Sequence, residues 1–76
     1  MIEFQTEIDA RGLNCPMPVM KVKKELKHLS KGDVLHVIAT DPASVQDMAI
    51  LLASLVDEML ETSEGGGEYH FYIKKS

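Results

Sequence analysis

The chain has 76 residues, of which 45% are hydrophobic and 26% are charged, and it holds a single cysteine. This composition is typical of one small globular domain over residues 1–76, and it excludes a disordered or a disulfide-stabilised chain. The formal net charge is −4 and only 5% of the residues are aromatic, so we expect no direct binding of nucleic acid. The charge is uneven: residues 11–31 contain six basic residues and one acid, whereas the rest contains two basic residues and eleven acids.

The N-terminal ten residues lack the apolar block of a signal peptide. The longest apolar run, MAILLASLV, is far too short to cross a bilayer. A lone free cysteine is typical of a reducing compartment. We therefore expect a soluble, cytoplasmic protein that does not insert into membranes.

The first half of the chain predicts a strand, a helix and a second strand. Residues 2–9 alternate between two kinds of side chain, which predicts a strand with one buried face. That face is predicted to comprise Ile2, Phe4, Thr6 and Ile8. After Pro18, apolar residues recur at spacings of three and four, which predicts an amphipathic helix that ends at the SKGD turn of residues 30–33. Residues 34–40, VLHVIAT, are mostly apolar and predict a central strand.

The segment DPASVQD, residues 41–47, predicts the start of a second helix. Asp41 fits an N-cap with Pro42 at the first helical position. Ser44 with Asp47 forms an alternative capping box one turn later. The apolar stripe of this helix is predicted to comprise Val45, Met48, Leu52, Leu55 and Met59.

The C-terminal region predicts a hairpin. Part of residues 57–63, DEMLETS, is expected to pair through the glycines of residues 65–67 with residues 68–75, EYHFYIKK. The element order is then βαβαββ, and right-handed crossovers place both helices on one face of a mixed four-stranded sheet. We therefore predict an α/β (α+β) two-layer sandwich. The other face of the sheet is left partly open, either to solvent or to a partner.

Cys15 stands between two prolines, at the predicted junction of the first strand and the first helix. Pro16 disfavours helical geometry for Cys15 and is itself preferred at the first helical position, which predicts that Cys15 is the N-cap. Its sulfur then lies at the positive end of the helix and near lysines, both of which favour the thiolate. Because the prolines have no amide proton, the amides of Met17 and Val19 are predicted to remain as local donors. The alternative is a buried, unreactive cysteine.

Few reactions suit one isolated thiol in so small a chain. Pro18 occupies the position where a thioredoxin-like pair would need its second cysteine. A cysteine hydrolase needs a histidine base and a cleft, but His28, His36 and His70 are scattered and are expected to be surface or sheet residues. Because these residues form no zinc-ligand pattern, we expect no metal and no other cofactor. Sulfane-sulfur transfer remains, since an exposed thiolate can accept a sulfur atom, hold it as a persulfide and pass it on.

Residues 9–24, DARGLNCPMPVMKVKK, resemble the Cys-Pro-x-Pro signature of the TusA/SirA/YedF family of small sulfur carriers. IATDPASVQD, residues 38–47, resembles the second motif of that family, and GGGEYHFYIKK, residues 65–75, resembles its final hairpin. The resemblance extends over essentially the whole chain. It implies the βαβαββ sandwich and a sulfurtransferase that acts as a persulfide carrier rather than as a multi-turnover enzyme on small molecules.

Carried over to this sequence, the resemblance implies that Cys15 is the active cysteine. Four residues are implied to shape its loop: Gly12, Leu13, Pro16 and Pro18. Asp41 begins the second motif. The implied partners are a donor protein, such as a cysteine desulfurase or a rhodanese, and an acceptor protein in tRNA thiolation, cofactor biosynthesis or sulfur oxidation.

The surface around the cysteine determines the choice of partner. Three basic residues are our candidates for partner docking: Arg11, Lys21 and Lys24. A solvated helix face is the alternative for the lysines. Asn14 and Gln46 stand where many tRNA-thiolation members of the family have arginines.

A competing interpretation of the whole chain is a non-enzymatic regulatory or interaction module, which binds through the open sheet face while the cysteine is incidental.

Overall fold

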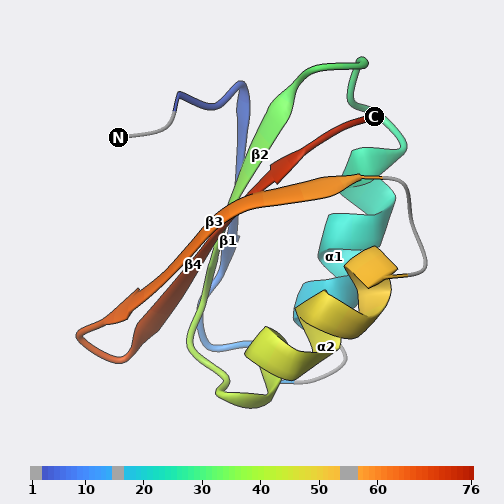
Figure 1. The fold of residues 1–76 in the computed structure, drawn as a ribbon. Coiled ribbons are helices and arrows are strands. Elements are labelled where there is room, and N and C mark those ends of the chain that lie inside the picture. The colour runs from blue at the N-terminus through green and yellow to red at the C-terminus, as the bar shows by residue number, and fades with distance from the viewer. Residues whose placement is uncertain (1–2, 15–16, 54–56) are drawn as a thin grey trace.

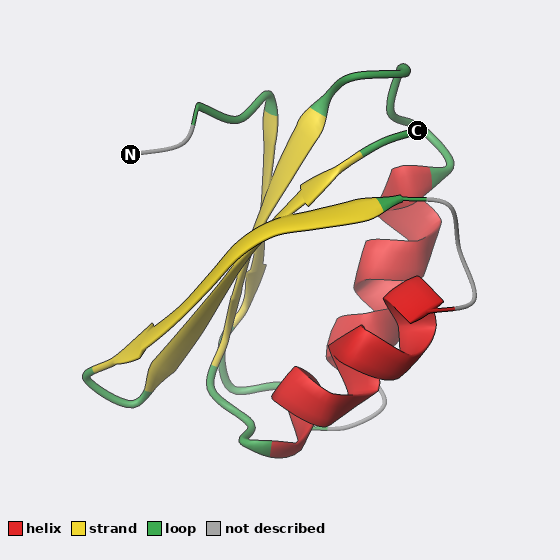
Figure 2. Cartoon of the chain, viewed as in Figure 1, coloured by secondary structure: helices red, strands yellow, loops and turns green. Residues whose placement is uncertain are grey.

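The structure is a computed structural model that describes residues 3–14, 17–53 and 57–76. Its elements follow the βαβαββ order, with both helices packed against one face of a twisted sheet (Figures 1 and 2). This arrangement confirms the predicted two-layer α+β sandwich. The elements are β1 (Thr6–Ala10), α1 (Met17–Leu26), β2 (Val34–Ala39), α2 (Ala43–Ala53), β3 (Glu58–Gly65) and β4 (Glu68–Lys74).

The four strands are ordered β1-β2-β4-β3, so β2 is central as its apolar sequence predicts. β1 and β2 are parallel, with Ile8 opposite Val37, and α1 provides the crossover that a parallel pair needs. The other two pairs are antiparallel, with Val37 opposite Phe71 and Phe71 opposite Thr62. The sheet is therefore mixed, as predicted.

The core lies between the helices and the inward side of the sheet. On α1, the buried positions recur every four residues, so one stripe of the helix faces the strands. Phe71 on β4 is the largest fully buried side chain and is only 1% exposed. The buried apolar residues are Ile8, Ala10, Val22, Leu26, Leu35, Val37, Ala39, Met48, Leu52, Phe71 and Ile73.

The predicted placement of Phe4 beside Ile8 is wrong. Gln5 lies in a bend just before β1, so the alternation of side chains does not continue back to Phe4. The Phe4 ring contacts His36 and Tyr72 on the open sheet face, at centroid distances of 4.9 and 6.3 Å. Ile8, in contrast, belongs to the core. The first residue predicted for that face lies outside the described part of the chain.

The predicted apolar stripe of the second helix is partly wrong. Val45 is 43% exposed, because it lies at the edge of the packed face and lines a shallow cavity beside the β3–β4 hairpin. Met59 lies in β3 rather than in the helix. Leu55 lies outside the described residues. The buried side of α2 is formed by Ser44, Met48 and Leu52.

The β3–β4 hairpin closes through a two-residue turn at Gly66 and Gly67, which have φ values of 61° and 80°. A type I′ turn requires positive φ at both central positions, which glycine adopts without strain. A register shift between Met59 and Glu61 bends β3 near its start. The hairpin predicted from the glycine run is confirmed, and it projects beyond the helix layer (Figure 1).

Candidate functional site

The loop between β1 and α1 contains the Cys-Pro-x-Pro motif. Cys15 and Pro16 lie outside the described residues, but both flanks are described. The Met17 amide donates a hydrogen bond of 2.9 Å to the Asn14 carbonyl, so the backbone on either side of the cysteine is tied together. The Met17 amide is therefore not a free donor, and our prediction that it remains available to a sulfur anion is wrong.

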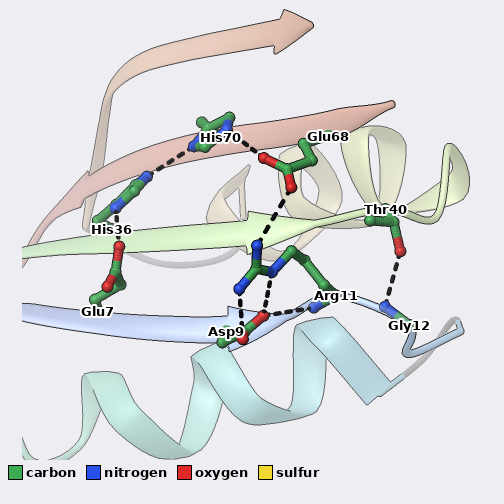
Figure 3. A network of polar contacts seen from close by, with 8 residues as sticks. All are labelled: Glu7, Asp9, Arg11, Gly12, His36, Thr40, Glu68 and His70. Atoms are coloured by element: carbon green, nitrogen blue, oxygen red, sulfur yellow. Dashed lines mark hydrogen bonds and ion pairs between the residues drawn. The ribbon is translucent and has the colours of Figure 1, made fainter. Parts of the chain in front are cut away.

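Gly12 and Leu13 tie the loop to the ends of β1 and β2. The Gly12 amide donates to Thr40 Oγ1 at 2.9 Å (Figure 3). The Leu13 amide donates to the Ala10 carbonyl at 3.2 Å, and the Leu13 side chain packs against the core. Pro18, on the other side of the cysteine, is buried in the first turn of α1. These contacts fix both ends of the loop at the carboxyl edge of the parallel strands, which is where α/β folds place their sites.

Gly12 has a φ of +81°, and a Cβ built there would meet no atom within 4 Å. Gly12→Ala is therefore expected to destabilise the fold through backbone strain alone, by about 1–2 kcal/mol. The matched control is Gly65→Ala, because Gly65 also has open space but no positive φ. We expect the control to change the stability by less than about 0.5 kcal/mol. Urea denaturation measures both, and equal shifts of the two midpoints would contradict the assignment of strain to Gly12.

The second motif starts α2. Asp41 Oδ1 accepts a hydrogen bond of 3.1 Å from the Ala43 amide, and the Asp41 carbonyl accepts one of 2.9 Å from the Ser44 amide. Pro42 directly precedes the helix, which begins at Ala43. Ser44 Oγ is buried and has no hydrogen-bond partner among the described residues. The alternative capping box, which needs that hydroxyl as an acceptor, is therefore wrong.

The exposed side of α1 combines basic and apolar groups. Lys21 and Lys24 are both exposed and lie three residues apart, on neighbouring positions of the helix surface. Lys24 also lies in the last turn, where a cation interacts favourably with the negative end of the helix. Met17 and Met20 are 45% and 56% exposed. We did not predict these methionines as surface groups, although both lie off the apolar stripe. An open depression on this side is lined by Met20, Lys23, Lys24, Lys27 and His28.

Arg11, our third docking candidate, is held in ion pairs. Its Nε and Nη2 donate to the two oxygens of Asp9 at 2.9 and 3.0 Å (Figure 3). Its Nη1 lies 3.4 Å from Glu68 Oε2. The hydrogen bonds from Arg11 lower the pKa of Asp9 from 3.8 to about 2, and the two carboxylates raise the pKa of Arg11. The positive charge of Arg11 is thus balanced locally by two carboxylates.

The Asp9–Arg11 pair predicts a specific dependence on pH. Because the pKa of Asp9 is lower in the folded chain than its ordinary 3.8, its contribution to stability is present above about pH 4 and is lost as the pH falls through about 2. Carboxyl ¹³C NMR should find the Asp9 midpoint near pH 2. The midpoint should return toward 3.8 in Arg11→Gln. An Asp9 midpoint that does not move in this variant would rule out Arg11 as the cause.

The open sheet face carries a line of polar contacts that the sequence did not predict. His36 on β2 is 6% exposed, and its Nδ1 lies 2.8 Å from Glu7 Oε1 on β1. Its Nε2 lies 2.9 Å from His70 Nδ1 on β4. His70 Nε2 in turn lies 3.3 Å from Glu68 Oε1 (Figure 3). The His36 ring also stacks on Tyr72. This line of contacts, here called the polar line, therefore joins Glu7, His36, His70, Glu68, Arg11 and Asp9.

The two histidines of the polar line each have a neighbouring carboxylate and contact each other. A carboxylate only accepts hydrogen bonds, so the 2.8 Å contact of His36 Nδ1 with Glu7 places a ring N–H on that nitrogen. The 2.9 Å contact between the rings needs a second N–H, on His36 Nε2 or on His70 Nδ1. One N–H on each ring is therefore enough for both hydrogen bonds.

Other kinds of site are absent from the described part of the chain. No group of three or more histidine, cysteine, aspartate and glutamate side chains is placed to hold a metal ion among these residues. No helix within residues 3–14, 17–53 and 57–76 is long and apolar enough to cross a membrane.

The class of protein that this fold and site define is a small two-layer α+β protein with a Gly-Leu-x-Cys-Pro-x-Pro loop between its first strand and first helix. A family model described as Sulfurtransferase TusA matches residues 6–75. A sulfur carrier protein TusA of Allochromatium vinosum is 51% identical over 76 residues, which cover 100% of both chains. One of Pseudomonas entomophila is 44% identical over 68 residues, which cover 90% of this chain and 85% of that protein.

A solved structure agrees with this result. The crystal structure of a SirA-like protein from Desulfitobacterium hafniense matches with a TM-score of 0.75 and 30% sequence identity, covering 92% of this chain and 96% of that one. The chain therefore belongs to the TusA sulfurtransferase family, as the resemblance of its motifs implied.

Proposed function

We propose that the chain is a sulfur carrier that holds a sulfane sulfur as a persulfide on Cys15 and passes it to an acceptor protein in a cytoplasmic sulfur relay. The observation that carries the proposal is the family match over residues 6–75, which includes the only cysteine of the chain. The relatives at 51% and 44% identity are themselves named sulfur carrier proteins. The chain is then a sulfurtransferase in the sense of a carrier.

The chemistry needs one thiol and two partners. In the first step the Cys15 thiolate attacks the outer sulfur of a persulfide on the donor. A new S–S bond forms on Cys15, the S–S bond of the donor breaks, and the donor leaves as a thiolate. In the second step a thiolate of the acceptor attacks the outer sulfur on Cys15. A new S–S bond forms on the acceptor, the S–S bond on Cys15 breaks, and Cys15 is left as a thiolate. Each step exchanges one S–S bond for another, so no oxidant or reductant is consumed.

The loop contacts support this role because they hold both flanks of the cysteine. Gly12 is fixed to Thr40, and Met17 is fixed to Asn14. Since the Met17 amide is already bonded, stabilisation of a sulfur anion falls to the positive end of α1 and to nearby lysines. We infer that the loop residues position the thiol and that partners supply the rest of the reaction centre.

A direct test is to offer sulfur and weigh the intact protein. The chain is incubated with a cysteine desulfurase and cysteine, or with a rhodanese and thiosulfate. We expect a gain of one sulfur atom that a thiol reductant removes and that Cys15→Ser does not show. If no donor of either class adds sulfur to the folded protein, the carrier function fails and the interaction module becomes the better explanation.

The basic side of α1 is the surface proposed to dock these partners. Lys21→Glu combined with Lys24→Glu is expected to slow sulfur loading by roughly tenfold or more at low salt, because reversing these two charges weakens electrostatic steering. The matched control is Lys74→Glu with Lys75→Glu, at the opposite end of the sheet from the β1–α1 loop (Figure 1). Loading rates at low and high salt measure the effect. Equal slowing by both pairs would show that only the net charge matters and that α1 is not the docking surface.

A further inference from the structure

We propose that Arg11 is a positioning residue for the loop of Cys15, held by Asp9 and Glu68, and that the histidine pair of the open face holds Glu68 in turn. This inference rests on the proposed function, because the loop that Arg11 positions is the one proposed to carry the sulfur. It also changes the role of Arg11, which the sequence suggested as a docking charge.

The first support is local. Asp9 Oδ1 accepts hydrogen bonds from both the amide and the Nε of Arg11, at 3.1 and 2.9 Å. Asp9 Oδ2 accepts a third from Nη2, at 3.0 Å. One carboxylate therefore fixes the backbone and the side chain of the same residue. Arg11 is joined directly to Gly12, so this contact sets the direction in which the chain leaves β1 and enters the loop.

The second support crosses the sheet. Asp9 lies on β1 and Glu68 on β4, and β2 separates these two strands. The guanidinium of Arg11 contacts both carboxylates, so it bridges strands that do not pair with each other (Figure 3). The next residue, Gly12, contacts Thr40, which directly follows β2. Arg11 and Gly12, the first two residues after β1, are therefore tied to the ends of β1, β2 and β4.

The third support orients Glu68. One of its oxygens faces Arg11 at 3.4 Å and the other faces His70 at 3.3 Å, so the carboxylate is held from two sides. His70 is bonded to His36, which is 6% exposed and is bonded at its other nitrogen to Glu7. The line of contacts thus passes through a buried side chain of β2, which gives the partly exposed contacts of Arg11 a rigid base.

These contacts favour positioning over docking. Three N–H groups of the Arg11 side chain face carboxylate oxygens, and the charge of the guanidinium is shared by two acids. An acidic partner surface that approached this region would meet more negative than positive charge. Lys21 and Lys24 are exposed on α1 and form no ion pair within residues 3–14, 17–53 and 57–76, so they fit docking better.

The test compares Arg11→Ala with two variants, Asp9→Asn and Glu68→Ala, in which the electrostatic effect and the positioning effect have opposite signs. Removing a cation in Arg11→Ala disfavours a nearby thiolate, whereas removing an anion in Asp9→Asn or Glu68→Ala favours it. If the polar line positions the loop, all three variants instead act in the same direction, because each loosens the loop. The readout is the rate of Cys15 alkylation by iodoacetamide across a range of pH, measured on the purified protein without any sulfur donor.

We expect all three variants to slow alkylation at pH 7 by roughly two- to fivefold, the factor that corresponds to exposed ion pairs. Half-maximal alkylation should move to higher pH in each. Arg11→Lys and Glu68→Gln should fall between these variants and the wild type, because lysine cannot donate two parallel bonds and glutamine keeps one acceptor. The matched control is Glu64→Gln, an exposed acid on the same hairpin, which should alkylate as the wild type does.

Two outcomes would overturn the inference. Unchanged alkylation in all three variants, with slower loading from a protein donor only in Arg11→Ala, would make Arg11 a docking charge. Slower alkylation in Arg11→Ala together with faster alkylation in Glu68→Ala would show that these residues act on the thiolate only through their charges and do not position the loop. Failure of the wild type to accept sulfur would instead count against the proposed carrier function, and the alkylation comparison would still decide whether Arg11 positions the loop.

Discussion

Phe71→Ala is expected to lower the free energy of unfolding by about 3–5 kcal/mol, the largest effect of any single core change in this chain. Phe71 is 1% exposed and lies on β4, opposite Val37 on β2 and Thr62 on β3. Its removal leaves a cavity at the centre of the sheet. A domain of this length typically has a total stability of about 4–11 kcal/mol, so much of the population would unfold.

The chain offers a control of identical chemistry, because its only other phenylalanine is Phe4. Phe4 is 41% exposed and contacts His36 and Tyr72 on the open sheet face. Phe4→Ala is expected to cost at most about 1.5 kcal/mol, the range for aromatic contacts of this kind. Urea denaturation followed by far-UV circular dichroism measures both variants. Equal losses would show that the core is not centred on Phe71.

Cys15→Ser is expected to abolish sulfur transfer completely while leaving the fold intact. A serine hydroxyl is not ionised near neutral pH and forms no S–S bond, so neither step of the relay can proceed. The measurement is delivery of sulfur from a desulfurase to an acceptor protein, with and without the carrier. Transfer should fall to the rate seen without the carrier, while the urea midpoint stays near that of the wild type. Sulfur delivery above that rate by Cys15→Ser would show that the chain acts by another route, for instance by holding donor and acceptor together.

The fold was predictable because its signals are local. The three- and four-residue spacing identified α1, the apolar run identified β2, and the glycine run identified the β3–β4 turn. Two of the wrong predictions arise where a neighbour outside the pattern decides the outcome. The bend at Gln5 places Phe4 on the opposite face, and the packing of α2 buries Ser44 rather than Val45. Both errors concern which side an apolar residue faces, which periodicity alone does not determine at the end of an element.

The polar contacts on the open sheet face were not predictable because they are non-local. His36 meets Glu7 and His70 only because β2 pairs with β1 in one register and with β4 in another. A partial signal was present, since Glu68 and His70 alternate with apolar residues along β4 and must therefore share one face. Arg11 and Glu68 lie 57 positions apart in the sequence, so no local sequence pattern predicts that they pair.

The most direct test of the carrier function is a single-turnover transfer. The chain is loaded with ³⁵S from labelled cysteine by a desulfurase, freed of donor by gel filtration, and mixed with an excess of an acceptor protein that has a reactive thiol. The proposal predicts that the label is bound to Cys15 before mixing, is released by reductant, and moves to the acceptor in a one-to-one amount. Label that never binds, or that binds but stays on the chain in the presence of every acceptor tried, would contradict it.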